Sequence, residues 1–169
     1  MVRYTVFSTK WGYFGLAGNE KGILKTVLPE KKKEAVERRL VEGLEKTVYE
    51  KGFLKEVQEL VRAYFEGSYV DFGRDIPIVM NGGGKFSREV YDRLRDVTYG
   101  QTISYGQLAE LAKSPGAARA VGQVMAKNNV PLIIPCHRVT CANGAMGGFS
   151  AWGGVGLKKK MLSLEREDG

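Results

Sequence analysis

The pattern of hydrophobic and polar residues differs between the two halves of the chain. Three runs rich in β-branched and aromatic residues come first, separated by short turn signals with Gly and Asn: residues 3–9, 11–18 and 22–29. They predict a small antiparallel meander. Two amphipathic segments with helical spacing of apolar residues follow, at 31–46 and 52–65. We therefore expect residues 1–80 to form an α/β domain in which helices pack on a sheet.

A glycine-rich segment separates this region from the rest. Residues 81–85 read NGGGK, a composition typical of a flexible connection, so we place a domain boundary there. The remaining residues, 86–169, predict a mostly helical second domain. Its last amphipathic helix is expected at residues 155–166.

The helices of the second domain have recognisable start signals. Ser87 precedes the first one, and Ser104 with Gln107 three residues later forms a capping box for the next. Ser114, followed by proline, predicts an N-cap for a helix that runs to about Lys127. These signals place three short helices before the cysteine-containing segment.

Two of these helices, at residues 105–112 and 115–127, are joined by the short segment KSPG, which is the layout of a helix-turn-helix. One face of the second helix carries small side chains and one long cation: Arg119, Gly122, Gln123 and Ala126. The opposite face, with Val121 and Val124, is expected to be buried. A flat face can approach a nucleic-acid groove closely. The alternative is packing of this face on another helix, with Arg119 extending to solvent.

Composition narrows the class of protein. With 169 residues, 43% hydrophobic and 27% charged, the chain is neither disordered nor membrane-spanning in character. Its N-terminus lacks the layout of a signal peptide, so a cytoplasmic protein is expected. The net charge of +7 favours a polyanionic partner such as nucleic acid.

The segment IPCHRV sets Cys136 beside His137, the only histidine of the chain. The pair is compatible with an activated nucleophile, part of a metal site, or chance. No CxxC motif accompanies Cys136 and Cys141, so we expect no metal. A nucleophilic thiolate needs a base or a positive charge nearby. Neighbouring residues of a regular element point to different sides, so a bent backbone or a bridging water is required.

Two further features frame the cysteine. The apolar run at residues 130–135 is interrupted by prolines and is expected to be buried and non-helical, delivering Cys136 to its end. A histidine base also needs an orienting carboxylate. Glu165 follows the apolar positions of the last helix, although the pattern alone favours a solvated Glu165.

These segments together resemble one family. ISYGQLAELA, AARAVGQVMAKN, VPLII, IPCHRV, CANGAMGGFSAWGG and LKKKMLSLE occur in this order and resemble the O6-alkylguanine-DNA alkyltransferases, also called methylated-DNA–protein-cysteine methyltransferases. The strong match runs from about residue 86 to residue 165. The N-terminal half matches in outline only. The resemblance implies a ribonuclease-H-like α/β domain followed by a mostly α domain with a helix-turn-helix.

The resemblance also implies a single-turnover reaction. The cysteine thiolate attacks the alkyl carbon on O6 of guanine in double-stranded DNA, guanine leaves, and the S-alkylcysteine is not regenerated. No cofactor, membrane or obligate protein partner is expected, and the protein is expected to be a monomer. Because the reacting atom lies inside the base stack, the nucleotide must be flipped out of the duplex.

The family's catalytic residues transfer by position. The resemblance makes Cys136 the alkyl acceptor and His137 its base, acting through a water. Glu165 holds the tautomer of His137, which revises the solvated interpretation of this residue. Asn128 corresponds to the asparagine that pins the turn leading into the site.

The family's DNA-binding residues transfer in the same way. Arg119 fills the gap in the stack from the minor groove, and Tyr105 flanks the flipped base and bonds its N3. The other positions assigned to the base or to phosphates are Met125, Val139, Phe149, Ser150, Ser87 and Ser114. Simpler roles exist for some: a capping turn for Tyr105, core packing for Met125 and helix caps for the two serines. Phe149 stands where many relatives have a tyrosine.

Three other function classes compete with repair. A damage-recognition protein that flips the base without reacting would lack the cysteine. A cysteine hydrolase or acyltransferase would need an oxyanion hole and repeated turnover, for which the sequence has no motif. A helix-turn-helix regulator would prefer a particular DNA sequence, whereas the resemblance implies little sequence preference.

Overall fold

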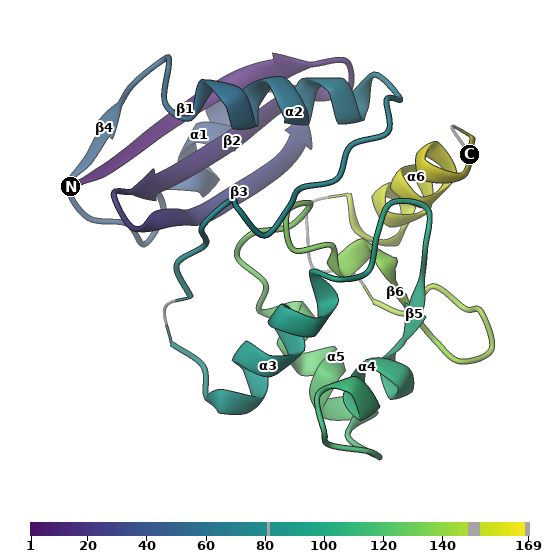
Figure 1. The fold of residues 1–169 in the computed structure, drawn as a ribbon. Coiled ribbons are helices and arrows are strands. Elements are labelled where there is room, and N and C mark those ends of the chain that lie inside the picture. Colours follow the sequence, from purple (N-terminus) through teal and green to yellow (C-terminus); the bar gives the residue numbers. More distant parts are fainter. Residues whose placement is uncertain (81, 149–152, 168–169) are drawn as a thin grey trace. The chain divides into compact units, whose positions relative to one another are not determined.

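The computed structural model describes residues 1–80, 82–148 and 153–167, without the side chain of residue 167. The chain divides into two compact units, Met1–Val79 and Met80–Gly169. In Figure 1 the first unit is coloured purple to blue-green and the second blue-green to yellow. The division falls just before the predicted linker.

The first unit is built on a four-stranded sheet. β1 (Val2–Thr9), β2 (Gly12–Asn19) and β3 (Gly22–Glu30) form an antiparallel meander with two-residue turns, which confirms the prediction. β4 (Thr47–Tyr49) pairs in parallel with β1, so the order is β3-β2-β1-β4. β4 was not predicted, because three residues at a sheet edge are too short to show an alternating pattern.

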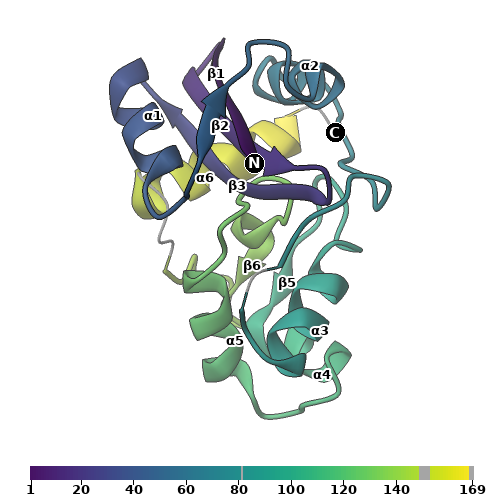
Figure 2. The ribbon, with the colours of Figure 1, turned by 90° about the vertical axis from the view of Figure 1, so that its left-hand side faces the viewer.

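One helix covers each face of this sheet (Figure 2). α1 (Lys33–Val41) packs Val36 and Leu40 onto the face that carries Val6. α2 (Lys55–Phe65) places Phe65 against Phe14 on the other face. Both helices are shorter than predicted. α1 ends near Gly43, whose φ of 78° is a conformation that stops a helix.

The second unit is mostly helical. Its elements are α3 (Lys85–Leu94), β5 (Ile103–Ser104), α4 (Tyr105–Leu111), α5 (Ala118–Ala126), η1 (Cys136–Arg138), β6 (Val139–Thr140) and α6 (Gly154–Glu167). β5 and β6 pair in parallel, with Ile103 opposite Val139. Since Tyr105 follows β5 and Cys136 lies just before β6, this short pairing brings α4 and η1 together.

Two of the three predicted helix starts are wrong. α3 begins inside the predicted linker with Gly84 as its N-cap, so Ser87 lies in its first turn. The N-cap of α5 is Ala117, whose N–H donates to the carbonyl of Ser114. The intervening Gly116 has a φ of 83°, so these residues form a separate turn instead of the start of a helix.

The third start is confirmed. The Ser104 hydroxyl accepts from Gln107 N at 3.0 Å, and Gln107 Oε1 accepts from Ser104 N at 2.9 Å, which completes the capping box of α4. This box fixes the entry of the chain into α4, whose first residue is Tyr105. The last helix also agrees with its prediction to within one or two residues.

α4 and α5 pack against each other as the predicted helix-turn-helix (Figure 1). α5 buries Val121 and Val124, whereas Arg119 and Gln123 are exposed, as the helical spacing predicted. None of the helices within the described ranges combines the length and the apolar character that crossing a membrane requires.

Candidate active site

Cys136 stands at the end of a tight, buried turn. The Ile134 N–H donates to the carbonyl of Val130 at 3.0 Å, and Leu132 at the apex has a φ of 78°, a region that leucine rarely adopts. Residues 130–135 are all buried, which confirms the prediction of a buried, non-helical run. The turn carries the chain into η1, whose first residue is Cys136.

Asn128 closes this turn from outside. Its Nδ2 donates to the carbonyl of Ile134 at 3.0 Å, and its Oδ1 accepts from the Val130 N–H at 2.9 Å. One side-chain amide therefore binds both ends of the turn. A further bond, from Cys136 N to the Ile134 carbonyl at 2.8 Å, holds the cysteine directly after it. The position of Cys136 thus depends on Asn128.

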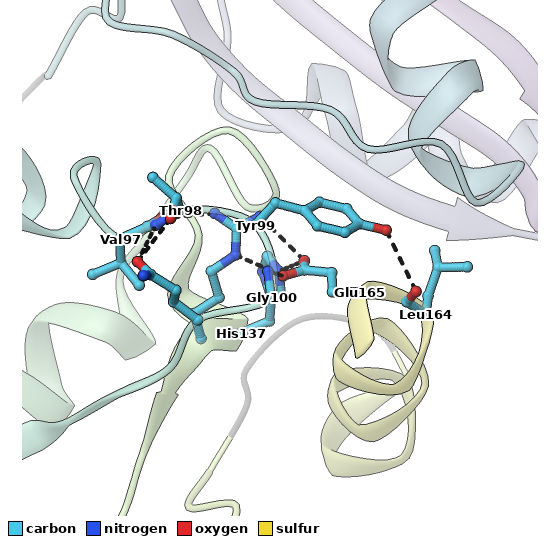
Figure 3. A network of polar contacts seen from close by, with 9 residues as sticks. Val97, Thr98, Tyr99, Gly100, His137, Leu164 and Glu165 are labelled. Carbon is cyan, nitrogen blue, oxygen red and sulfur yellow. Dashed lines mark hydrogen bonds and ion pairs between the residues drawn. The ribbon is translucent and has the colours of Figure 1, made fainter. Parts of the chain in front are cut away.

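Glu165 of α6 is the centre of a buried polar network (Figure 3). His137 Nε2 lies 2.6 Å from Glu165 Oε2. Arg138 donates through Nε at 2.8 Å and through Nη2 at 3.2 Å, and the Gly100 N–H donates at 3.0 Å. Glu165 is buried, so the solvated interpretation from the pattern is wrong.

The charges of this network follow from its geometry. Burial alone raises the pKa of Glu165, but hydrogen bonds and charges from His137 and Arg138 outweigh it, and the pKa lies well below its usual range. Burial lowers the pKa of His137, Glu165 raises it, and the positive charges of Arg138 and Lys158 lower it, so that the pKa lies below its usual value. At neutral pH the pair is therefore a carboxylate and a neutral imidazole. The bond to Glu165 requires the proton on Nε2, which leaves Nδ1 as an acceptor.

A pocket of about 620 Å³ opens beside Cys136. The residues lining it include five from α5 and three from elsewhere: Ala118, Arg119, Gly122, Met125 and Ala126, with Tyr105, Cys136 and Gly148. The small-residue face of the second helix of the helix-turn-helix thus forms one wall, and the thiol lies in another. Met125 is mostly buried and also lines this pocket, so it contributes to core and wall together.

The backbone of Gly147 packs closely against the Tyr105 side chain in this pocket. Gly147 has a φ of 69°, and a Cβ built on it would lie 2.6 Å from the Tyr105 hydroxyl oxygen. The close approach leaves no space for a side chain at position 147. Burial raises the pKa of the Tyr105 phenol, and the charges of Cys141 and Cys136 raise it further, so the hydroxyl remains protonated and can donate.

Lys158 is a site residue that the sequence interpretation missed. It is fully buried, and its Nζ donates to the carbonyl of Val139 at 2.6 Å and of Gly148 at 3.3 Å, while lying 5.8 Å from the centre of the Tyr105 ring. Burial lowers its pKa, and the charges of Cys136 and Cys141 oppose this. It therefore places positive charge beside the pocket.

A sequence signal for Lys158 did exist. Lys158, Met161, Leu162 and Glu165 are spaced i, i+3, i+4 and i+7, and all four are buried on one face of α6. Because Lys158 belongs to a run of three lysines, and such runs are usually solvated, the sequence interpretation did not place it on the buried face. Arg138 was also missed, although it lies within the cysteine motif and is buried with bonds to Glu165 and to the Val97 carbonyl.

Burial has the largest effect on the pKa of the Cys136 thiol. It raises the pKa of Cys136 to about 11, although a hydrogen bond from Asn128 and the positive charge of Lys158 act in the opposite direction. The thiol is therefore mostly protonated at neutral pH. Its activation requires a base and nearby positive charge.

The remaining predicted positions have different surroundings. The Val139 carbonyl accepts from Lys158. Ser87 and Ser114 are half-buried, and neither is among the described residues that line the pocket. Phe149 and Ser150 lie outside the described residues. Across the described ranges, no group of three or more His, Cys, Asp or Glu residues could hold a metal ion.

Comparison with known proteins covers both units. Residues 2–78 match the family model of the ribonuclease-like domain of 6-O-methylguanine DNA methyltransferase, and residues 85–167 match the model of its DNA binding domain. The methylated-DNA–protein-cysteine methyltransferase of Methanosarcina acetivorans is 32% identical over 162 residues, 96% of this chain and 97% of that protein. The protein of the same name from Cricetulus griseus is 35% identical over 97% of this chain and 82% of its own length.

Solved structures agree with these relatives. The crystal structure of Mycobacterium tuberculosis O6-methylguanine methyltransferase has a TM-score of 0.80 at 30% identity, covering 100% of this chain and 95% of that one. A structure of the Mycobacterium tuberculosis protein in complex with DNA has a TM-score of 0.82 at 28% identity, covering 99% and 94%. The two domain models and relatives of nearly equal length show that this chain belongs to the methylated-DNA–protein-cysteine methyltransferase family.

Proposed function

We propose that this protein repairs double-stranded DNA by moving the alkyl group from O6 of guanine to Sγ of Cys136, once per molecule. The observation that carries the proposal is the pocket in which a thiol faces the small-residue side of α5, the second helix of the helix-turn-helix. A base turned out of the duplex would enter beside this helix and meet the sulfur. The reaction needs no cofactor, and we place it in the cytoplasm.

The proposed transfer balances as a displacement. A bond forms between Sγ and the alkyl carbon while the bond from that carbon to O6 breaks, and its electron pair moves into the guanine. The thiol proton passes through a water to Nδ1 of His137, which is free of the proton because Glu165 holds it on Nε2. As guanine leaves, the Tyr105 hydroxyl transfers its proton to N3, so that guanine departs as a neutral base. The tyrosine oxygen then regains a proton through water, which balances the proton that His137 took from the thiol. The resulting thioether is stable, which ends the reaction after one turnover.

In this proposal Lys158 lowers the energy of the thiolate. The buried ammonium interacts with Cys136 across the pocket wall, and its bonds to the Val139 and Gly148 carbonyls keep it there. Two side chains, Asn128 and Lys158, lower the pKa of Cys136. Without Lys158, the hydrogen bond from Asn128 would be the one side-chain interaction of these two left to stabilise a buried thiolate. The same bonds fix the Val139 carbonyl, which we assign to the edge of the bound guanine together with Cys136 and Ser150.

DNA binding is assigned to the second unit. Residues 80–169 contain 12 of the 26 Lys and Arg residues but only 7 of the 19 Asp and Glu residues, so most of the net charge of +7 lies there. Such an excess favours phosphate contacts without sequence preference. Arg119 is exposed at the pocket edge and would occupy the space that the flipped base leaves. Ser87, Ser114, Met125 and Phe149 remain proposed contacts of DNA or base.

The first prediction concerns the acceptor. Cys136→Ser should abolish methyl transfer from a duplex carrying one O6-methylguanine, because an alcohol is a far weaker nucleophile than a thiolate. The matched control is Cys141→Ser, which removes the other thiol and should transfer one methyl group per molecule. Peptide mass spectrometry locates the methyl group. A methylated peptide in the Cys136→Ser protein, or none in the unsubstituted protein, would refute the proposal.

The second prediction concerns Arg119. Arg119→Ala should slow transfer from duplex DNA by about 10- to 100-fold, since unstacking a base costs a few kcal/mol that the arginine offsets. Reaction with free O6-methylguanine base should change little, because it requires no flipping. Lys127→Ala, which removes an exposed cation just beyond the same helix, is the control for general charge. Equal losses with both substrates would contradict the assignment.

The third prediction concerns pH. Because the pKa of Cys136 is about 11 and that of His137 lies below its usual value, the thiol keeps its proton and the imidazole stays neutral over a wide range. The transfer rate should therefore change little between about pH 7 and pH 9.5 and should fall at lower pH, as His137 takes up a proton. Lys158→Met should raise the pKa of Cys136 further and slow transfer about 10-fold across this range, since an adjacent opposite charge shifts a pKa by about 1 to 3 units. Rates of single-turnover transfer measure both effects.

The control for this experiment is Lys159→Met, which removes the exposed neighbouring lysine. It should leave the pH profile unchanged. Melting temperatures of all variants identify loss of fold. If folded Lys158→Met transferred the methyl group within about 2-fold of the unsubstituted rate at every pH, Lys158 would have no part in stabilising the thiolate.

A further inference from the structure

Tyr91 of α3 makes a short hydrogen bond to the end of α5. Its hydroxyl donates to the carbonyl of Val124 at 2.6 Å, and the same carbonyl accepts from the Lys127 N–H at 3.1 Å. Val124 lies in the last turn of α5, where carbonyl groups lose their usual partners four residues on. The tyrosine therefore supplies a second hydrogen bond to a carbonyl in the last turn of α5, and this bond comes from a different helix.

The bonded turn leads directly to the acceptor. Asn128, the next residue after Lys127, donates its own N–H to the Met125 carbonyl at 3.2 Å and binds both ends of the turn before Cys136 with its side chain. The junction between the pocket-lining helix and the acceptor turn is thus short. Any tilt at the end of α5 would shift its pocket face relative to the sulfur.

Tyr91 also lies near the thiol without lining the pocket's described wall. Burial, together with negative charge on Cys136, raises the pKa of Tyr91 to about 12, so the phenol remains a donor throughout the reaction. Its hydroxyl is directed to the Val124 carbonyl and is used in that bond. The contact therefore acts on helix position and not on the sulfur itself.

We propose that Tyr91 is a positioning residue for alkyl transfer: its hydroxyl holds the end of α5 so that a base entering along the Arg119 face arrives in line with Sγ of Cys136. This inference rests on the proposed function. It predicts a specific division of effects. Duplex DNA, which must be aligned by α5, depends on the hydroxyl, whereas a free base that diffuses into the pocket depends on it much less.

The test is Tyr91→Phe, which removes one oxygen and keeps the ring. Transfer from duplex O6-methylguanine should slow about 3- to 10-fold, the factor that one neutral hydrogen bond typically contributes, while reaction with free O6-methylguanine base should change less than 2-fold. Amide hydrogen exchange at Lys127 and Asn128 should quicken by a similar 3- to 10-fold, since both amides close the last turn of α5.

The control is Tyr4→Phe, which removes a hydroxyl that donates to Glu37 in the first unit. It should alter neither substrate's rate nor exchange in α5. Placing 4-aminophenylalanine at position 91 restores a donor and should recover the duplex rate, which a role in packing alone would not predict. Melting temperatures show whether each variant is folded.

The outcomes separate the two proposals. If the unsubstituted protein transfers no methyl group, the proposed function fails, and hydrogen exchange still decides whether Tyr91 holds the end of α5. If the unsubstituted protein reacts and Tyr91→Phe leaves exchange and the duplex rate unchanged, the inference is wrong. Equal slowing with duplex and free base would also overturn it, because that result indicates a general loss of structure at Cys136.

Discussion

The site of this protein depends on one buried carboxylate. Glu165 joins α6 to η1 and to the loop at Gly100, and it does so without access to water. An ionised group in such surroundings is costly unless it is paired and hydrogen-bonded. Arg138 provides the paired charge with two bonds. His137 can therefore remain neutral, since it is not required to balance Glu165, and a neutral imidazole is what a general base must be.

α6 connects this network to the electrophile's pocket. Lys158 and Glu165 are two helical turns apart on the same buried face, with apolar side chains between them. The Glu165 carboxylate orients the His137 base, and the Lys158 ammonium acts on the Cys136 thiol. One rigid helix thus sets the two opposite charges at a fixed separation. The Cys136 thiol has a high pKa because the effect of burial exceeds that of the nearby positive charge. A protonated thiol suits a nucleophile that is used once and must not react with other electrophiles before its substrate binds.

Local patterns in the sequence predicted the elements that depend on local interactions. The meander, the capping box at Ser104 and the two faces of α5 all follow from spacing and turn chemistry. Features that depend on distant partners were not predictable in this way. β4 exists because β1 offers an edge, and Glu165 is buried because Arg138 lies opposite it. Ser114 has the signature of an N-cap, but the positive φ of Gly116 redirects the chain into a separate turn. The residues alone left Cys136 and His137 open between a nucleophile with its base, part of a metal site, and chance. The family resemblance assigned their roles and that of Asn128.

The most direct test of this account is the protonation of the only histidine, His137, which gives a single imidazole spectrum. Nitrogen-15 chemical shifts of the ring, recorded between about pH 5 and pH 8, report both charge and tautomer. The account predicts a neutral ring at pH 7 with its proton on Nε2, and a pKa below the usual value for histidine. A doubly protonated ring at pH 7, or a proton on Nδ1, would contradict it, because neither form could accept a proton from the Cys136 thiol.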